Sequence, residues 1–150
     1  MEDRRLVPLI AALVVVVAGT PAAHAQKEEW LSVAKGDRTE LFVRPASLKW
    51  DGDWLSIRSK QNFAEAQPSA KKGKTFLSAR NEYRIACAFQ KIAYREMQAY
   101  AEPDLQGAVV QKTRISEKNL KWMDAPEGTV FGELLEYACE NAPPAPAAAQ

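Results

Sequence analysis

The chain has 150 residues, enough for one domain and not comfortably for two. It carries 20 lysines and arginines against 19 aspartates and glutamates, a formal net charge of +1. A balance so close to neutral gives no whole-molecule argument for nucleic acid or acidic lipid as the partner.

Residues 1–25 have the pattern of a secretory signal peptide. A charged start, Met1 to Arg5, precedes an apolar run from Leu6 to Gly19, and Ala23 and Ala25 fit the A-x-A cleavage pattern. The apolar run is shorter than the stretch of about 20 residues that spans a membrane. We expect cleavage between Ala25 and Gln26 and an exported chain, periplasmic or at the bacterial cell surface. An uncleaved anchor or a buried helix is the alternative.

The only histidine, His24, lies in the segment that this cleavage removes. The mature chain then lacks the side chain most often used as a general base near neutral pH. Triads that need a histidine and zinc sites built on histidine are excluded. An enzyme would have to use carboxylates, lysine or tyrosine, and we expect no cofactor and no metal.

Short alternating segments separated by turns come next, a pattern typical of antiparallel strands. The first expected strand runs from Trp30 to Val33, and the second from Leu41 to Arg44, where Pro45 stops it. Asp51-Gly52 is a strong turn signal, and a strand from Trp54 to Arg58 leaves it. Two aspartates beside a glycine also suggest calcium. No series of further oxygen ligands follows, so a hairpin is the preferred interpretation.

Residues Gln67 to Lys74 are polar, include a proline and a glycine, and are expected to form a loop. Its lysines, Lys71, Lys72 and Lys74, are candidates for contact with an anionic partner. A solvated loop is the plainer interpretation of the same residues.

From Ala79 to Phe89 the sequence alternates with the two-residue period of a half-buried strand. The buried face is expected to hold Tyr83, Ile85, Cys87 and Phe89. The polar face is expected to hold Arg80, Glu82 and Arg84.

Residues Gln90 to Tyr100 leave helix and strand open. Their alanine, glutamine, glutamate and methionine favour a helix, whereas a strand would put Ile92, Tyr94 and Tyr100 on one face. Pro103-Asp104 predicts a turn, and Ala108 to Ile115 is predicted to be a strand.

The period changes to that of a helix from Val130 to Glu140. Apolar residues at helical spacing form a stripe of Phe131, Leu134, Leu135, Ala138 and Cys139. Thr129 is placed to cap the start of this helix, just after Pro126. The pattern predicts a helix whose stripe packs across one face of the sheet.

The two cysteines, Cys87 and Cys139, predict a disulfide bond. An exported chain meets an oxidising compartment, where an even number of cysteines indicates bridges. The strand and helix periodicities separately point both sulfurs at the same core. A bond closing a loop of about 50 residues would contribute about 4 kcal/mol. Two free thiols or an intermolecular bridge are the alternatives.

Asn141 to Gln150 is low in complexity and rich in proline and alanine, which predicts a disordered tail. The expected organisation is therefore a signal peptide at 1–25, a folded domain at 26–140 and a tail at 141–150.

Six features follow one another along the chain: Trp30, the Ser47-Leu48 step, Tyr83 to Cys87, Gly107 to Val110, Trp122 with Pro126, and Phe131 to Cys139. Their order and spacing resemble the surface-adhesin E family of bacterial envelope proteins. The chain departs from the family pattern at Arg44-Pro45, where the family tends to carry an acidic residue, and at Glu127-Gly128-Thr129.

The resemblance implies an α+β fold, with a six-stranded antiparallel sheet and a C-terminal helix packed on one face and tethered by a disulfide. It places Gln90 to Tyr100 in a strand and implies a possible homodimer. The name-giving relatives bind host extracellular-matrix proteins from the bacterial surface. The resemblance therefore implies a non-enzymatic protein whose partner is a host matrix protein or an envelope protein.

The first candidate function is this adhesin-like binding through one face or edge of the sheet. The possible partner surface consists of Arg58, Lys60, Lys71, Lys72, Lys74, Arg80 and Arg84. Trp50, Trp54 and Trp122 could anchor such an interface, since aromatic residues are enriched there, but a place in the core is the plainer interpretation.

Two other functions stay open. A periplasmic carrier of a small ligand, or an enzyme inhibitor, would use a groove between helix and sheet. An enzyme could draw acid–base chemistry from Glu133 and Glu136. Both glutamates lie off the apolar stripe of the expected helix, which favours a solvated face.

Overall fold

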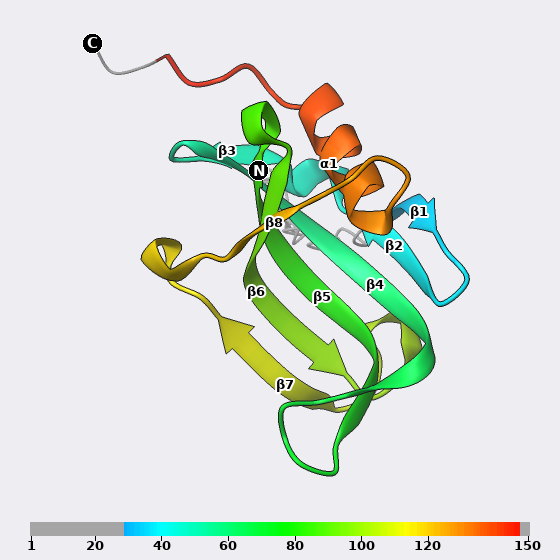
Figure 1. The fold of residues 1–150 in the computed structure, drawn as a ribbon. Helices are drawn as coiled ribbons and strands as arrows, with labels where there is room; N and C mark the ends of the chain where they lie inside the picture. Colours follow the sequence, from blue (N-terminus) through cyan, green and yellow to red (C-terminus); the bar gives the residue numbers. More distant parts are fainter. Residues whose placement is uncertain (1–28, 148–150) are drawn as a thin grey trace, which may run out of the picture.

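The computed structural model describes residues 29–147, which form an antiparallel sheet with one α-helix against one face (Figure 1). The strands are β1 (Leu31–Lys35), β2 (Thr39–Val43), β3 (Lys49–Asp51), β4 (Trp54–Pro68), β5 (Thr75–Ala86), β6 (Lys91–Tyr100), β7 (Val109–Arg114) and β8 (Trp122–Asp124). The helix is α1 (Val130–Glu140). The expected signal peptide, its cleavage site between Ala25 and Gln26, and His24 lie outside the described residues.

The main path of the sheet runs β1-β2-β4-β5-β6-β7, and every neighbouring pair is antiparallel. The expected six-stranded sheet and its closing helix are thereby confirmed. Two short strands lie outside the expected six: β3, the first arm of the predicted hairpin, pairs with β4, and β8 pairs with β6, which makes eight strands in all. Each has three residues, too few for a periodic pattern to be recognised.

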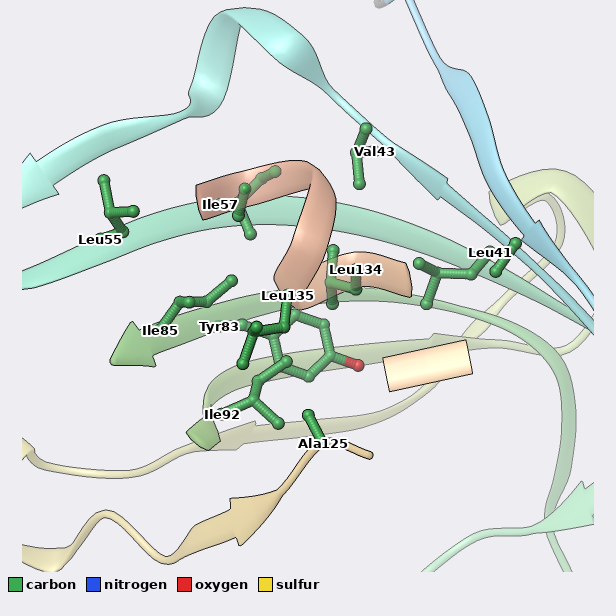
Figure 2. Close-up of a cluster of buried hydrophobic side chains, with 12 residues drawn as sticks. Leu41, Val43, Leu55, Ile57, Tyr83, Ile85, Ile92, Ala125, Leu134 and Leu135 are labelled. Carbon is green, nitrogen blue, oxygen red and sulfur yellow. The ribbon is translucent and has the colours of Figure 1, made fainter. Parts of the chain in front are cut away.

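The core lies between the sheet and α1. Figure 2 shows Leu134 and Leu135 of the helix among Ile57, Tyr83 and Ile92 from three strands. Because side chains alternate along a strand, the residues between these buried ones point to the opposite face of the sheet. That opposite face has no α-helix over it among the described residues.

The start of α1 is capped as the sequence predicts. The amide of Gly132 donates to Thr129 Oγ1 at 3.0 Å, and the Thr129 hydroxyl donates to the carbonyl of Pro126 at 2.7 Å. The apolar stripe is also confirmed, with Leu134, Leu135 and Ala138 buried against the sheet. The cap and the stripe together fix where the helix begins and which side faces inward.

We predict that Gly132→Ala lowers the free energy of unfolding by about 2–3 kcal/mol. A Cβ at this position would lie 2.1 Å from the carbonyl oxygen of Pro126, so the capping loop would have to move. Gly36→Ala is the matched control, because its Cβ would meet nothing closer than 3.7 Å, and we expect a change within about 0.5 kcal/mol. Urea denaturation followed by tryptophan fluorescence measures both; equal effects would contradict the prediction.

Cys87 and Cys139 form a disulfide bond, 52 residues apart in sequence, that joins the turn after β5 to the last turn of α1. The local geometry at Cys87 differs from the expected strand. Strand β5 ends at Ala86, a 3-10 turn covers Cys87–Phe89, and Gln90 takes a left-handed conformation with φ of 50°. The prediction for Phe89 was wrong, because this turn leaves its ring 68% exposed instead of buried.

Residues Lys91–Tyr100 form strand β6, as the resemblance implied. An irregularity opposite the Glu82–Tyr83 step leaves Arg95 without a partner on β5. The extra residue shifts the alternation, so Ile92 pairs with buried Ile85, whereas Tyr100 pairs with Ser78 on the opposite face. The expectation that Ile92, Tyr94 and Tyr100 share one face was therefore right for Ile92 and Tyr94, which both face the core, and wrong for Tyr100.

The C-terminal segment stays attached to the fold beyond the expected boundary at residue 141. Ala142 packs against the main core cluster, the buried side chains between the sheet and α1 that include Ile57, Tyr83 and Leu134. The indole N–H of Trp50 donates to the carbonyl of Pro143 at 2.9 Å. Any free tail therefore begins after Pro143, because these contacts hold the preceding residues beside β3.

Candidate functional site: the open face of the sheet

The face of the sheet opposite α1 carries two rows of polar side chains that cross four strands. One row joins Lys60, Arg80, Gln98 and Lys112, which are direct cross-strand partners. The next row joins Arg58, Glu82, Glu96 and Arg114 in the same way. We call the residues that remain accessible here the open face: Arg58, Arg80, Glu82, Glu96, Gln98, Lys112 and Arg114.

The centre of the open face is a shallow depression whose lining includes Arg58, Arg80, Glu82, Glu96 and Gln98. Arg58 lies 3.6 Å from Glu82, and the guanidinium of Arg80 donates to Gln98 Oε1 at 2.9 Å. These contacts hold the side chains across neighbouring strands while leaving them half-buried or exposed. The surface is thus charged, ordered and reachable from solvent.

One end of this face is closed by the turn after β6, which contains a short 3-10 segment, Pro103–Leu105. Asp104 Oδ1 accepts from Lys60 Nζ at 2.9 Å and from Asn62 Nδ2 at 2.8 Å. These two hydrogen bonds lower the pKa of the Asp104 carboxyl. Lys60 also lies over the ring of Phe42, and only 11% of its side chain is exposed. Lys60 therefore secures the turn and presents little surface to a partner.

Arg84 closes the other end, and the structure corrects its expected place on a partner surface. Arg84 is only 3% exposed, since the segment around Glu117 folds over it. The guanidinium donates to Asp51, Ser56, Glu82 and Glu117, at distances from 2.7 to 3.1 Å. Burial alone would lower the pKa of Arg84, but the hydrogen bonds that its guanidinium donates to Glu117 and Glu82 outweigh burial and raise the pKa.

Lys71, Lys72 and Lys74 lie at the tip of the β4–β5 hairpin, and all three are exposed. The tip is held against β7 by Gln111, whose Oε1 accepts from Ser69 Oγ at 3.0 Å and from the amide of Ala70 at 2.8 Å. Within residues 29–147 these lysines form no ion pair. The expected basic loop therefore exists as an ordered cationic tip beside an edge strand.

The remaining candidate residues serve the fold. Trp54 and Trp122 contact each other with ring centroids 4.8 Å apart, and Trp50 holds the C-terminal segment. The predicted hairpin is present, but its two turn residues are Gly52 and Asp53, and Asp51 pairs with Trp54 as the last residue of β3. In the part of the chain that the structure describes, no three metal-ligating side chains come together. Glu133 and Glu136 lie on α1, and Glu136 is exposed, as expected for the solvated side of the helix.

Sequence reasoning assigned Arg58 and Arg80 to the partner surface. It left out the other residues of the open face, which are Glu82, Glu96, Gln98, Lys112 and Arg114. The extra residue at Arg95 hides the alternation in β6. The alternation of Lys112 and Arg114 along β7 was a signal that could have revealed the rest.

The family model for surface-adhesin protein E matches residues 30–140. The chain belongs to the surface-adhesin protein E family. The match spans the whole sheet and α1, so the described fold is the family domain.

The fold of this family member is similar to that of Haemophilus influenzae protein E, with a TM-score of 0.53. The two share 12% sequence identity over 77% of this chain and 86% of that chain, a likeness of fold alone. A comparison with curated proteins finds no match. None of the helices within residues 29–147 has the length and apolar character needed to cross a membrane.

Proposed function

We propose that this family member is an exported, non-enzymatic binding protein of the bacterial cell envelope that engages a protein partner through the open face. The family name and the signal-peptide pattern at 1–25 support export to the periplasm or the cell surface. The observation that carries the proposal is the open face itself. Its charged rows cross four strands, and no element of residues 29–147 covers Arg58 or Glu96.

The partner that fits this face is a protein carrying charges of both signs, such as a host matrix protein or another envelope protein. Basic Arg58 and Arg80 lie beside acidic Glu82 and Glu96, so complementary pairs can form in a fixed register. A homodimer implied by the family resemblance stays a prediction, which light scattering of the purified protein would test.

A non-enzymatic role is supported by the state of the buried tyrosines. Tyr83 and Tyr94 contact each other with ring centroids 4.7 Å apart. Burial raises the pKa of both phenols, which keeps them protonated as packing side chains of the core. A small-ligand carrier has less support, because Leu134 and Ala138 are fully buried between helix and sheet. The pocket of about 320 Å³ that borders α1 lies at the outer edge of the helix, where Glu136 and Glu140 are exposed.

We predict that the double variant Arg58→Glu and Arg80→Glu loses at least tenfold in affinity for a matrix protein that the wild type binds. Reversing two charges at the centre of an interface replaces attraction by repulsion. Lys121→Glu is the matched control, because it reverses an exposed lysine outside the open face. Biolayer interferometry against immobilised matrix proteins and envelope fractions measures the affinities. No saturable binding by the wild type would refute the proposed function.

A further inference from the structure

Strand β7 forms one border of the open face and is an edge of the sheet. The amide of Ile115 donates to the carbonyl of Arg95 at 2.9 Å, which fixes the phase of hydrogen bonding between the last two strands of the path. Main-chain groups alternate along an antiparallel strand, so those of Thr113 and Gln111 point toward β6. The amide and carbonyl groups of Lys112 and Arg114 therefore point outward, and within residues 29–147 no backbone group pairs with them on that side.

The side chains of β7 differ between its two faces. Lys112 and Arg114 extend onto the open face and are exposed. Among residues 29–147, neither forms an ion pair. The cationic tip of Lys71, Lys72 and Lys74 lies next to the first half of the strand, held there by Gln111.

The other face of β7 borders an apolar pocket of about 210 Å³. Its lining includes Tyr94, Met97, Thr113 and Ile115. Met97 and Thr113 are direct cross-strand partners, so the pocket lies on the helix side of the sheet, at its edge. A strand added beside β7 would direct every second side chain toward this pocket and the others toward the lysine and arginine.

We infer that the β7 edge binds an extended segment of the partner protein as an added strand, in which acidic and apolar residues alternate. This inference rests on the proposed function, since it describes how the same partner is recognised. Main-chain hydrogen bonds to Lys112 and Arg114 supply affinity, and the pocket and the basic side chains select the sequence. Acidic side chains lie opposite Lys112 and Arg114, and an apolar side chain between them enters the pocket.

The test uses the full chain as its host processes it and a short synthetic peptide that alternates glutamate with valine around a central phenylalanine. We expect saturable binding and slower hydrogen exchange at the amides of Lys112 and Arg114. A peptide with lysine in place of glutamate should not bind measurably. A peptide N-methylated on the pairing edge should bind about tenfold more weakly, because it cannot donate the main-chain hydrogen bonds.

Two variants of the protein separate the main chain from the charge. Lys112→Pro removes the outward amide and is compatible with an edge strand, since that amide does not bond to β6. Lys112→Gln keeps the amide and removes only the charge. We expect about tenfold weaker binding for the proline variant and about threefold for the glutamine variant. If the proline variant fails to fold, the N-methylated peptide still decides.

The inference is overturned if the acidic peptide does not bind, if N-methylation has no effect, or if exchange at Lys112 and Arg114 is unchanged. Protection of these amides by self-association alone would also overturn it, because the occupant would be a second copy. If the Arg58 and Arg80 variant no longer binds the native partner but the Lys112→Pro variant still binds it, the proposed function stands and strand addition at β7 is ruled out. If no native partner binds, the proposed function fails and the peptide still decides the inference.

Discussion

Removing the bond between Cys87 and Cys139 is expected to lower the free energy of unfolding by about 2–5 kcal/mol. The bond closes a loop across 52 residues and joins the turn after β5 to the last turn of α1. Without it the unfolded chain gains conformational freedom, and the C-terminal end of the helix loses its covalent tie to the sheet. Domains of this size are stable by only about 5–15 kcal/mol, so the change is a large share of the total.

The measurement compares urea denaturation of the native protein with that of the same protein in a reducing agent. The reduced wild type keeps both sulfur atoms in place and isolates the covalent link. The double variant Cys87→Ala and Cys139→Ala adds the loss of sulfur packing, since both residues lie against the main core cluster. Two reactive thiols in the unreduced, denatured protein would contradict the prediction, because they would show that the disulfide bond does not form.

Replacing Arg84 with alanine is expected to cost about 2–3 kcal/mol. The guanidinium has five N–H groups, and all are used by Asp51, Ser56, Glu82 and Glu117. Removing one side of a buried ionic cluster leaves the other groups without compensation. Asp51 and Glu117 are about half exposed and recover part of their solvation, which keeps the loss below that of a fully buried pair.

Arg58→Ala is the matched control, because Arg58 pairs with the same Glu82 at 3.6 Å but is 52% exposed. Exposed pairs contribute less than about 1 kcal/mol. Arg84→Lys should fall between the two, since an ammonium retains the charge but has three donors. Chemical denaturation at neutral pH ranks the three variants. Equal losses for Arg84→Ala and Arg58→Ala would show that burial of the cluster adds nothing.

Local patterns in the sequence predicted the elements that are long enough to repeat. The α1 stripe, the Thr129 cap and the alternation around Tyr83 and Ile85 were confirmed because each depends on neighbours within a few residues. The turn at Phe89 could not be predicted, because the left-handed residue that ends it is Gln90 and not a glycine. The added residue at Arg95 likewise has no local signal.

The candidate site was less predictable because long-range contacts decide which charges remain accessible. Arg84 looks like Arg80 in the sequence, yet the segment carrying Glu117 buries the first and leaves the second partly exposed. Lys60 is likewise made largely inaccessible by its hydrogen bond to Asp104, 44 residues further along the chain. Arg58 and Arg80 stay accessible because no segment within residues 29–147 folds over their part of the face.

The hydrogen bond from Trp50 to Pro143 determines on which side of the molecule the C-terminal segment leaves the fold. It therefore also sets the orientation of protein that is immobilised through this segment. Trp50 packs with the core beneath α1, so residues 144–147 leave the fold on the helix side of the sheet (Figure 1). A label attached through this segment would consequently lie opposite the open face, the surface that we propose binds the partner. Capturing the protein by this segment on a sensor should leave Arg58, Arg80 and the β7 border turned toward the analyte.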